Sequence, residues 1–381
     1  MKFLFNYFVS IPRGYRPIFL GFSIIISIFC GCTSKNKNLP DAVGVTGDLY
    51  LFMDSAQWHG PLGIIMDSIF TTPVVGLPRR EPMFKIRWID PRKLSTVLKQ
   101  RRNLIFAMTL DKTGKGVQVL KSLFSPQSIE KIKSDTSQFY QIEHNLFARG
   151  QEVMFLFSNS EPSLINKIRT HHKKLTYFFN QKEKERLSVS LFKSNQMSGI
   201  TKLLQTKFRC SLKIPFGYKL ADKRDDFMWV RQLNPKDDKD VFIARKVYKS
   251  KKDFSKANII NFRDSICREY LFRDPQYLDS YLVTEKRPYI PVRADTIQLN
   301  GNFCIRLTGL FRSNDFLLGG PFVGYAVVDE GTNQFYYLEG FTISPGVDQR
   351  EIMRELEAIL LTFKTSKEIS NQAVEEQKSA K

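Results

Sequence analysis

Residues 47–196 alternate between short apolar runs and amphipathic segments. Apolar runs bounded by polar residues predict buried strands, and apolar positions three or four residues apart predict helices. The predicted strands cover residues 49–53, 104–110, 117–120 and 153–157, with 104–110 and 117–120 as a hairpin. Predicted helices cover 61–70 and 162–180, and two more start at Asp90-Pro91 and Ser125-Pro126. In both pairs a capping residue precedes a proline, which favours a helix start.

Residues 197–364 contain a second set of elements that is richer in strands. The predicted strands cover residues 227–230, 241–247, 303–307, 322–328 and 334–343, and a predicted helix covers 255–270. The last three strands form an expected antiparallel meander. A final helix is expected to open at Ser344-Pro345, and its apolar residues form one stripe: Ile352, Leu356, Ile359, Leu360 and Phe363.

These patterns predict an α+β fold of two sequential parts. Each part is expected to resemble an α/β sandwich with a mixed or antiparallel sheet, and an amphipathic helix closes the second part. The predicted domains are residues 47–196 and 197–364. The polar residues 365–381 are expected to be a disordered tail.

The N-terminus has the organisation of a signal peptide. Three cationic residues precede an apolar segment at 18–29, and the small residue Gly31 precedes Cys32. Twelve helical residues extend about 18 Å, against about 30 Å of bilayer hydrocarbon, which makes a membrane-spanning helix the poorer alternative. We therefore predict a signal peptide at residues 1–31 and a tether at residues 32–46.

Residues 29–32 resemble a lipobox, in which a small residue precedes a lipidated cysteine. Gly31 fits this pattern, whereas Phe29 replaces the usual aliphatic residue. Cys30 is the weaker candidate, because Phe29 would then lie at the cleaved bond. The resemblance implies acyl chains such as palmitate on Cys32, and two or more chains hold a protein stably at a membrane. Plain secretion is the other alternative. We expect a cell-envelope protein facing the periplasm, since residues 33–38 lack an acidic cluster.

The chain is strongly basic, with a formal net charge of +20. Removal of residues 1–31 takes away three positive charges and leaves about +17. Such a charge favours an anionic neighbour, here anionic lipid or an envelope glycan, although a solvated lysine-rich surface is an equal alternative. Export removes nucleic acid from the expected partners. The candidate anion-contact face on the predicted helix 162–180 consists of Lys167, Arg169, Lys173 and Lys174.

The sequence contains no recognisable catalytic, metal or cofactor signature. Cys210, Cys267 and Cys304 are scattered, and we interpret them as buried apolar thiols. His171 and His172 are adjacent, so on a helix they point about 100° apart and cannot hold one metal as an i, i+4 pair can. We expect no cofactor.

Two function classes remain open. The leading hypothesis is a non-enzymatic binding or assembly lipoprotein. The alternative is an envelope hydrolase with a carboxylate-based site, for which Asp264, Asp329 and Glu339 are candidates without known geometry. The arginine pairs 79–80 and 101–102 favour structural ion pairs over anion binding.

Several stretches resemble an uncharacterised lipoprotein family of Bacteroidetes-type bacteria, a domain of unknown function. They are LPRREPMF (77–84), QRRN (100–103), IPFGY (214–218), FMWVR (227–231), GGPF (319–322) and LEGF (338–341). The first stretch departs from the family pattern LPQPEP at Arg79 and Arg80. The resemblance implies a lipoprotein over about residues 44–364 and brings no activity, cofactor or catalytic residue with it.

Overall fold

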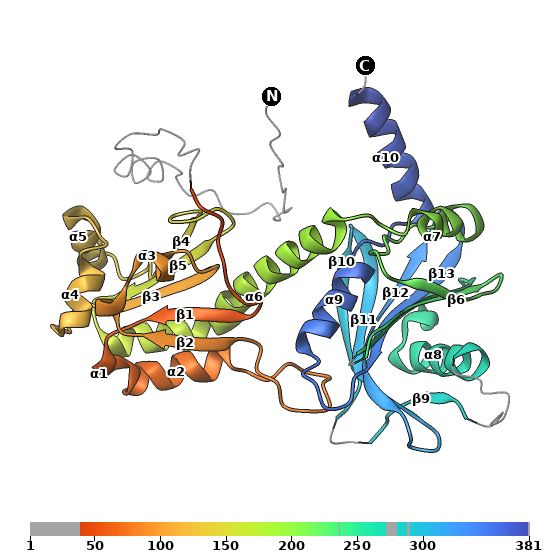
Figure 1. Ribbon diagram of the computed structural model, residues 1–381, viewed down its shortest axis with the longest axis horizontal. Helices are drawn as coiled ribbons and strands as arrows, with labels where there is room; N and C mark the ends of the chain where they lie inside the picture. Colours follow the sequence, from red (N-terminus) through yellow and green to blue (C-terminus); the bar gives the residue numbers. More distant parts are fainter. Residues whose placement is uncertain (1–38, 236, 272–279, 288–289, 380–381) are drawn as a thin grey trace. The chain divides into compact units, whose positions relative to one another are not determined.

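The computed structural model describes residues 39–235, 237–271, 280–287 and 290–379. The predicted signal peptide and the lipid-attachment residue Cys32 lie outside these ranges. Residues Asp41–Lys381 form one compact unit. The predicted α+β fold is confirmed, with a mixed sheet followed by an antiparallel sheet (Figure 1). The division into two domains near residue 200 stays a prediction.

The first sheet contains five strands in the order β2-β1-β3-β5-β4. They are β1 (Asp48–Phe52), β2 (Lys85–Ile89), β3 (Asn103–Thr109), β4 (Tyr140–His144) and β5 (Glu152–Ser158). The first three and β5 run parallel, and β4 pairs antiparallel with β5. The end of the predicted tether also contacts this part, because Ala42 N donates to Arg149 O at 2.9 Å.

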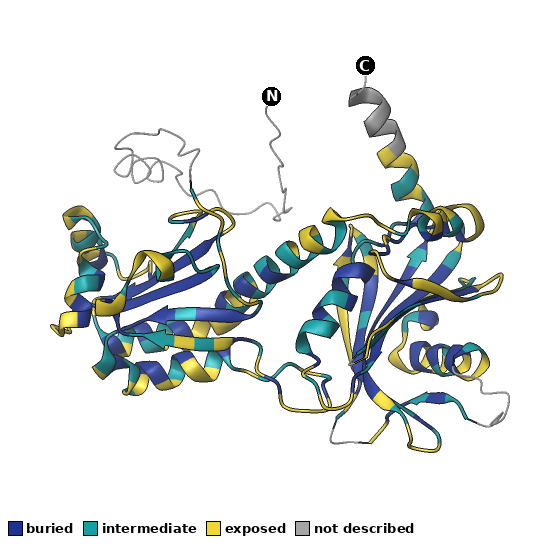
Figure 2. Ribbon diagram, viewed as in Figure 1, coloured by how far each residue is buried: buried dark blue, intermediate teal, exposed yellow. Residues whose placement is uncertain are grey.

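Helices cover both faces of this sheet. The core on one face is built with α2 (Pro61–Phe70) and α6 (Glu161–Lys193). The core on the other face includes Leu120 of α4 (Lys115–Lys121) and Ile132 of α5 (Pro126–Ser134). Short helices at α1 (Ser55–Trp58), η2 (Pro91–Lys93) and α3 (Thr96–Lys99) complete this part. Every residue of β3 and β5 is buried, and burial on both faces explains why both strands are apolar between their polar end residues (Figure 2).

The predicted strand at 117–120 is wrong, because these residues lie in α4. Strands β3 and β5 are parallel neighbours, and between them the chain runs through α4, α5 and the antiparallel β4. Val117 and Leu120 are buried and three residues apart, so they point to the same side of α4. A four-residue apolar segment is too short to distinguish this spacing from strand alternation.

The second sheet contains eight strands and is antiparallel throughout. The order is β10-β11-β12-β13-β8-β7-β6, and β9 pairs with β11. The strands are β6 (Lys219–Lys223), β7 (Phe227–Leu233), β8 (Asp238–Val247), β9 (Leu282–Thr284), β10 (Arg293–Leu299), β11 (Asn302–Ser313), β12 (Gly319–Asp329) and β13 (Gln334–Ile343). The predicted meander of β11, β12 and β13 is confirmed.

This sheet also separates two hydrophobic cores. On one face lie α7 (Ser198–Leu203), the π-helical η3 (Leu204–Phe208) and α9 (Arg350–Leu360). On the other face lies α8 (Lys256–Tyr270), preceded by η4 (Lys251–Phe254). Buried strand residues line both sides of the sheet (Figure 2).

The C-terminal region departs from the prediction in two ways. Helix α9 begins at Arg350, several residues after Ser344-Pro345, and its first N–H groups bind Glu81. Residues Ser366–Ser379 form helix α10 instead of a disordered tail. Asp329 anchors its start by accepting hydrogen bonds from the Ser366 N–H at 3.0 Å and from its hydroxyl at 2.5 Å. The sequence hides this cap, because Asp329 lies at the end of a distant strand.

Close approach of α9 to the sheet requires Gly340 on β13. A Cβ atom at this position would lie 2.8 Å from Leu356 Cβ of α9. Gly340 belongs to the LEGF stretch, which pairs with the last residue of the GGPF stretch through Phe322–Phe341, and Gly340 itself pairs with the following Val323. These two stretches are therefore neighbouring strand segments beneath α9.

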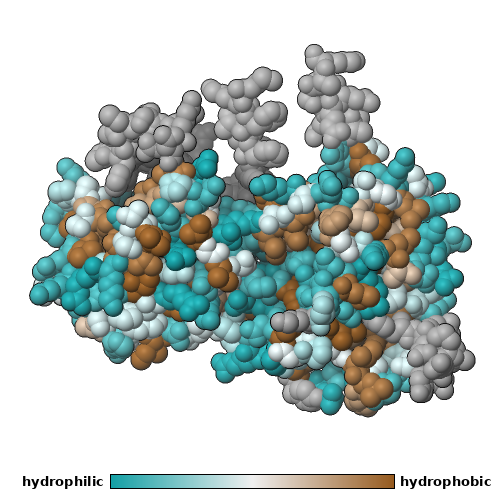
Figure 3. Space-filling model, viewed as in Figure 1, coloured by the Kyte–Doolittle hydropathy of each residue, from teal (hydrophilic) through white to brown (hydrophobic). Residues whose placement is uncertain are grey.

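The surface of the described residues is largely hydrophilic on the face shown in Figure 3, with smaller hydrophobic groups between polar ones. In this part of the chain, every helix is too short or too polar to cross a bilayer.

Replacing Gly340 by alanine is expected to lower the free energy of unfolding by about 1–3 kcal/mol, because the new methyl group overpacks the α9 contact. Urea unfolding followed by circular dichroism measures the change. The matched control is Gly199→Ala in α7, where a Cβ meets no atom within 4 Å. There we expect a gain of up to about 1 kcal/mol from helix propensity. Equal effects of the two substitutions would contradict the packing explanation.

Candidate ligand-binding site

A cavity of about 320 Å³ lies beside α9; we call it the α9 cavity. Its walls come from residues 72–77 after α2, from α6, from β10 to β12 and from α9. The charged residues of the lining are Lys184, Arg293, Asp295, Arg306, Arg350, Arg354 and Glu357.

Glu357 is the centre of a polar network at this cavity. Its Oε1 accepts hydrogen bonds from Arg306 Nε at 2.6 Å and from the Tyr325 hydroxyl at 2.7 Å. Its Oε2 lies 2.8 Å from Lys184 Nζ. One buried carboxylate of α9 thus binds β11, β12 and α6 together.

The two cations keep Glu357 ionised. Burial alone would raise the pKa of this carboxyl, but the charges of Arg306 and Lys184 and their hydrogen bonds outweigh burial and lower it from 4.5 to about 2. The same ion pair raises the pKa of Arg306. Glu357 is therefore a permanent anion at neutral pH.

The N-terminus of α9 binds the segment before β2. The Glu81 carboxylate accepts hydrogen bonds from the N–H groups of Gln349 and Arg350, each at 2.8 Å. Arg350 Nη1 donates to Pro82 O at 2.6 Å, and Arg354 Nη2 donates to Met83 O at 2.9 Å. A carboxylate at a helix N-terminus is stabilised by the free N–H groups and the helix dipole.

Positive charge exceeds negative charge in the α9 cavity. Five lining residues are cationic and two are acidic, which leaves a formal excess of three positive charges. Glu351 binds Arg350 and Arg354 at 2.6 and 2.7 Å without lining the cavity, and counting it reduces the excess to two. Among the residues that the structure describes, no hydrogen-bonding or ion-pair partner contacts the Arg293 side chain. The arrangement suits an anionic ligand.

A second buried network lies on the other face of the antiparallel sheet. Arg263 of α8 and Glu339 of β13 are fully buried and form two hydrogen bonds of 2.7 and 2.8 Å. The Tyr337 hydroxyl donates to Glu339 at 2.6 Å. Burial raises the pKa of Glu339 against the opposing effect of Arg263.

The candidate acid–base residues separate into two groups. Asp264 accepts hydrogen bonds from the Thr284 N–H at 2.9 Å and its hydroxyl at 2.6 Å, and it lies 3.3 Å from Arg263 Nη1. Arg263 therefore brings Asp264 and Glu339 into one network. Asp264 also lines an open cleft of about 1060 Å³ between α8 and β9. Asp329 takes no part in this network and holds the start of α10.

The four residues of the candidate anion-contact face lie on α6 with different exposure. Arg169, Lys173 and Lys174 are exposed, and Lys174 Nζ lies 5.1 Å from the centre of the Tyr140 ring. The Nζ of Lys167 is buried without a partner among the described atoms, and burial lowers the pKa of this residue. A role of this face in anion contact stays a prediction.

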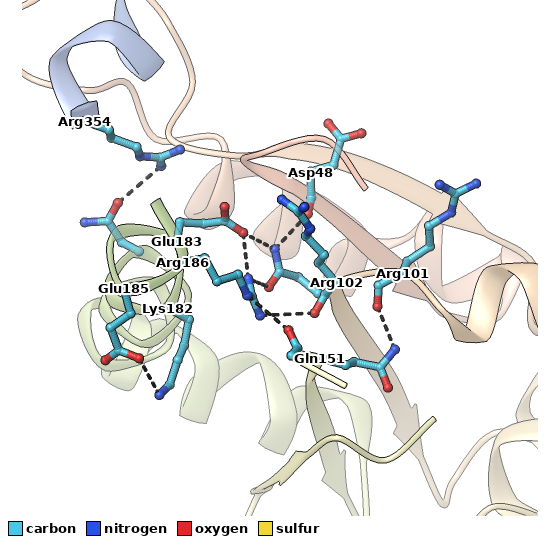
Figure 4. A network of polar contacts seen from close by, with 12 residues as sticks. Asp48, Arg101, Arg102, Gln151, Lys182, Glu183, Glu185, Arg186 and Arg354 are labelled. Atoms are coloured by element: carbon cyan, nitrogen blue, oxygen red, sulfur yellow. Dashed lines mark hydrogen bonds and ion pairs between the residues drawn. The ribbon is translucent and has the colours of Figure 1, made fainter. Parts of the chain in front are cut away.

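The QRRN stretch takes part in the attachment of α6 to the first sheet (Figure 4). The buried Asn103 amide donates to Glu183 Oε1 at 2.5 Å, and Arg186 Nη1 donates to the same oxygen at 2.9 Å. Arg186 Nη2 also donates to Arg102 O at 3.4 Å. Arg101 stacks over the Tyr50 ring at 5.3 Å. Asn103, rather than the two arginines, is the buried member of this stretch.

Sequence reasoning missed most of the α9 cavity. Arg350, Arg354 and Glu357 lie outside the apolar stripe predicted for the last helix, and the sequence pattern assigns them no role of their own. Their partners Lys184 and Arg306 lie far away in sequence, and no spacing rule joins them. The one local signal was the i, i+4 spacing of Arg350 and Arg354. In the LPRREPMF stretch, Arg79 binds Val347 O and Arg80 is exposed without a partner among the described residues.

The predicted burial of Cys210, Cys267 and Cys304 is confirmed. Burial raises the pKa of all three thiols, for Cys304 to about 12. The thiolate is the reactive form of cysteine, so these residues are poor nucleophiles at neutral pH. Within the described ranges, no group of three or more His, Cys, Asp or Glu side chains is arranged to hold a metal ion.

Two family models match the chain, and both are domains of unknown function. Residues 42–192 match DUF8532, and residues 197–362 match DUF4837. Two stretches of the chain therefore match domains of unknown function, in agreement with that part of the resemblance. No curated protein matches the chain.

Several solved structures have limited similarity to this chain. One is a protein of Bacteroides thetaiotaomicron with 9% identity and a TM-score of 0.23, covering 41% of this chain and 44% of that protein. This chain thus spans less than half of that protein's length. The Ran-binding protein Mog1p of Saccharomyces cerevisiae has 9% identity and a TM-score of 0.28, and the match covers 45% of this chain and 96% of that protein. A STAR-related lipid transfer protein of Xanthomonas axonopodis has 10% identity and a TM-score of 0.20, with coverage of 38% and 96%.

Replacing Glu357 by glutamine is expected to lower the free energy of unfolding at pH 7 by on the order of 3 kcal/mol, because two partly buried cations lose their counter-ion. The pKa of Glu357 is lowered in the folded state, so its stabilising effect is present above about pH 4.5. It is lost as the pH falls from 4.5 towards 2. The difference between wild type and variant should shrink over this range in urea unfolding series.

The matched control is Glu130→Gln on α5. Glu130 forms an exposed i, i+3 pair with Lys133 at 2.6 Å. Exposed pairs of this kind contribute about 0–1 kcal/mol, so we expect a small effect. A Glu357→Gln effect that stays constant from pH 7 to pH 2.5 would contradict the assigned charge network.

Proposed function

We propose that this chain is a lipid-anchored, non-enzymatic binding protein of the cell envelope, with the α9 cavity as its ligand site. The observation that carries the binding role is the excess of positive charge in this cavity. A small number of convergent polar groups within a partly apolar cavity is typical of ligand sites. The anchor is supported by the basic, apolar and Gly31-Cys32 segments of the sequence.

The arrangement of carboxylates supports binding over acid–base catalysis. Both acids of the α9 cavity, Asp295 and Glu357, lie next to Arg306. A general base needs a free lone pair within reach of substrate, and Glu357 uses both oxygens for hydrogen bonds or ion pairs. The residues of this cavity can attract an anion, but its two carboxylates are placed to form ion pairs and not to transfer protons to or from a ligand.

An envelope hydrolase is the second candidate, and the cleft between α8 and β9 favours it. This cleft exposes Asp264 near Glu339, whose pKa is raised. However, Glu339 is fully buried and bound by Arg263 and Tyr337, so substrate has no direct access to it. Ester, phosphoester and glycoside hydrolysis by the full chain, lost in Asp264→Asn, would favour this candidate over the binding role.

The partner that we propose for the basic surface is anionic lipid or envelope glycan. Exposed Arg169, Lys173 and Lys174 on α6 support this contact. Attraction between exposed charges is screened over about 10 Å at 0.1 M salt. Binding of the full chain to anionic vesicles or glycan should therefore weaken as salt is raised, and binding that is insensitive to salt would argue against this contact.

Mass spectrometry of the mature protein is expected to find Cys32 at the N-terminus with diacylglycerol on its sulfur. The full chain should be produced in a bacterium that processes lipoproteins and recovered from the membrane fraction. Cys32→Ser should abolish acylation and release the protein from membranes, since stable anchoring requires at least two acyl chains. Cys30→Ser is the matched control and should leave acylation and membrane attachment unchanged. A mature chain that begins at Met1, or at an unmodified residue after Cys32, would contradict the anchor.

A further inference from the structure

The α9 cavity has two chemically different walls. The cationic wall contains Lys184 of α6, Arg293 of β10, Arg306 of β11 and the first turns of α9. The apolar wall consists of side chains without charge or hydrogen-bonding groups, namely Val74, Val75 and Leu77 together with Pro321 and Val323 of β12. A ligand that satisfies both walls must contain both an anionic and an apolar group.

The cationic wall retains donors for a ligand. Arg306 donates to Glu357 through Nε, and its Nη1 lies 3.8 Å from Asp295, beyond hydrogen-bonding distance. Arg293 and Thr308 are register partners on β10 and β11, so both reach the cavity from the same strand pair. Within the described part of the chain, neither side chain has a hydrogen-bonding partner. Guanidinium groups bind carboxylate and phosphate in a planar, two-point geometry.

The apolar wall is held in place by a tight turn. Gly76 has a φ of +86°, which favours glycine, and a Cβ there would lie 3.3 Å from Thr308 Cβ. The turn therefore packs directly against β11 and places Val74, Val75 and Leu77 at the cavity. Val75 is 46% exposed, which puts it at the opening rather than in the core.

We propose that the α9 cavity binds a small amphiphilic anion, with one carboxylate or phosphate group at Arg293 and Arg306 and an apolar group against the 74–77 turn. This ligand class rests on the proposed binding function and makes it specific. The volume of 320 Å³ corresponds to about eleven water molecules at roughly 30 Å³ each. A six-carbon chain with one acidic head group is of suitable size.

The test is calorimetric titration of the full chain in lipid nanodiscs, with empty nanodiscs subtracted. The probes are hexanoate, hexyl phosphate, hexanol and inorganic phosphate. We expect hexanoate, hexyl phosphate or both to bind at least about tenfold more tightly than hexanol and inorganic phosphate, since each of these lacks one group. The ratio of the two amphiphiles identifies carboxylate or phosphate as the preferred head group.

Two pairs of variants locate the binding. Arg293→Gln should weaken binding of the tighter amphiphile at least about fivefold and leave hexanol unchanged, because it removes one charge-assisted contact. Its control is Arg80→Gln, an exposed arginine that does not line the cavity. Val75→Glu should weaken the same amphiphile by placing negative charge at the opening. Its control is Val97→Glu on α3, where the valine is 61% exposed.

The outcomes separate this ligand class from the proposed function. If hexanol binds as tightly as both amphiphiles, the ligand does not need an anionic group and the proposal is overturned. If inorganic phosphate binds as tightly as both amphiphiles, the ligand does not need an apolar group and the proposal is likewise overturned. Equal losses of affinity for the amphiphile in Arg293→Gln and Arg80→Gln would show general electrostatic attraction to the surface instead of binding at a defined site. Release of inorganic phosphate from hexyl phosphate would contradict the non-enzymatic function while leaving the ligand class intact.

Discussion

The ionised carboxylate of Glu357 connects the elements around α9. Its partners Lys184, Arg306 and Tyr325 come from α6, β11 and β12. A buried ion pair gains little over apolar packing, but removal of one member leaves an uncompensated buried charge. Its main effect is therefore geometric: α9 must lie where this single carboxylate can reach all three partners.

Two further constraints fix the same helix. Gly340 allows α9 to approach β13, since a side chain there would collide with Leu356. Glu81 binds the first N–H groups of α9, and this contact places the preceding residues 72–77 along the wall of the cavity. The position of α9 therefore determines the position of the cavity. Its lining combines the charged side chains that bind the helix with the apolar turn that Glu81 brings close.

The elements that could be predicted are those determined by local pattern. Apolar runs gave the strands β3, β5 and β13, and the cap Ser125-Pro126 gave the start of α5, because burial and capping act over a few residues. The strand predicted at 117–120 is wrong because four residues are too few to distinguish helical from strand periodicity. The role of Glu357 was hidden for a different reason. In the sequence of the helix, Glu357 resembles any solvated acid. Its partners Arg306 and Lys184 come near only through tertiary folding, so the sequence pattern does not show that Glu357 is buried.

The surplus of positive charge in the α9 cavity has an energetic consequence. Arginine and lysine side chains that exceed their carboxylate partners repel one another, and partial burial reduces screening by solvent. Apolar packing at Gly340 and the Glu357 network must compensate for this repulsion when no ligand is bound. A bound anion would relieve the repulsion and stabilise the folded state according to its concentration and affinity. In the proposed function, the charges that destabilise the position of α9 in the empty cavity are the same charges that attract the anion.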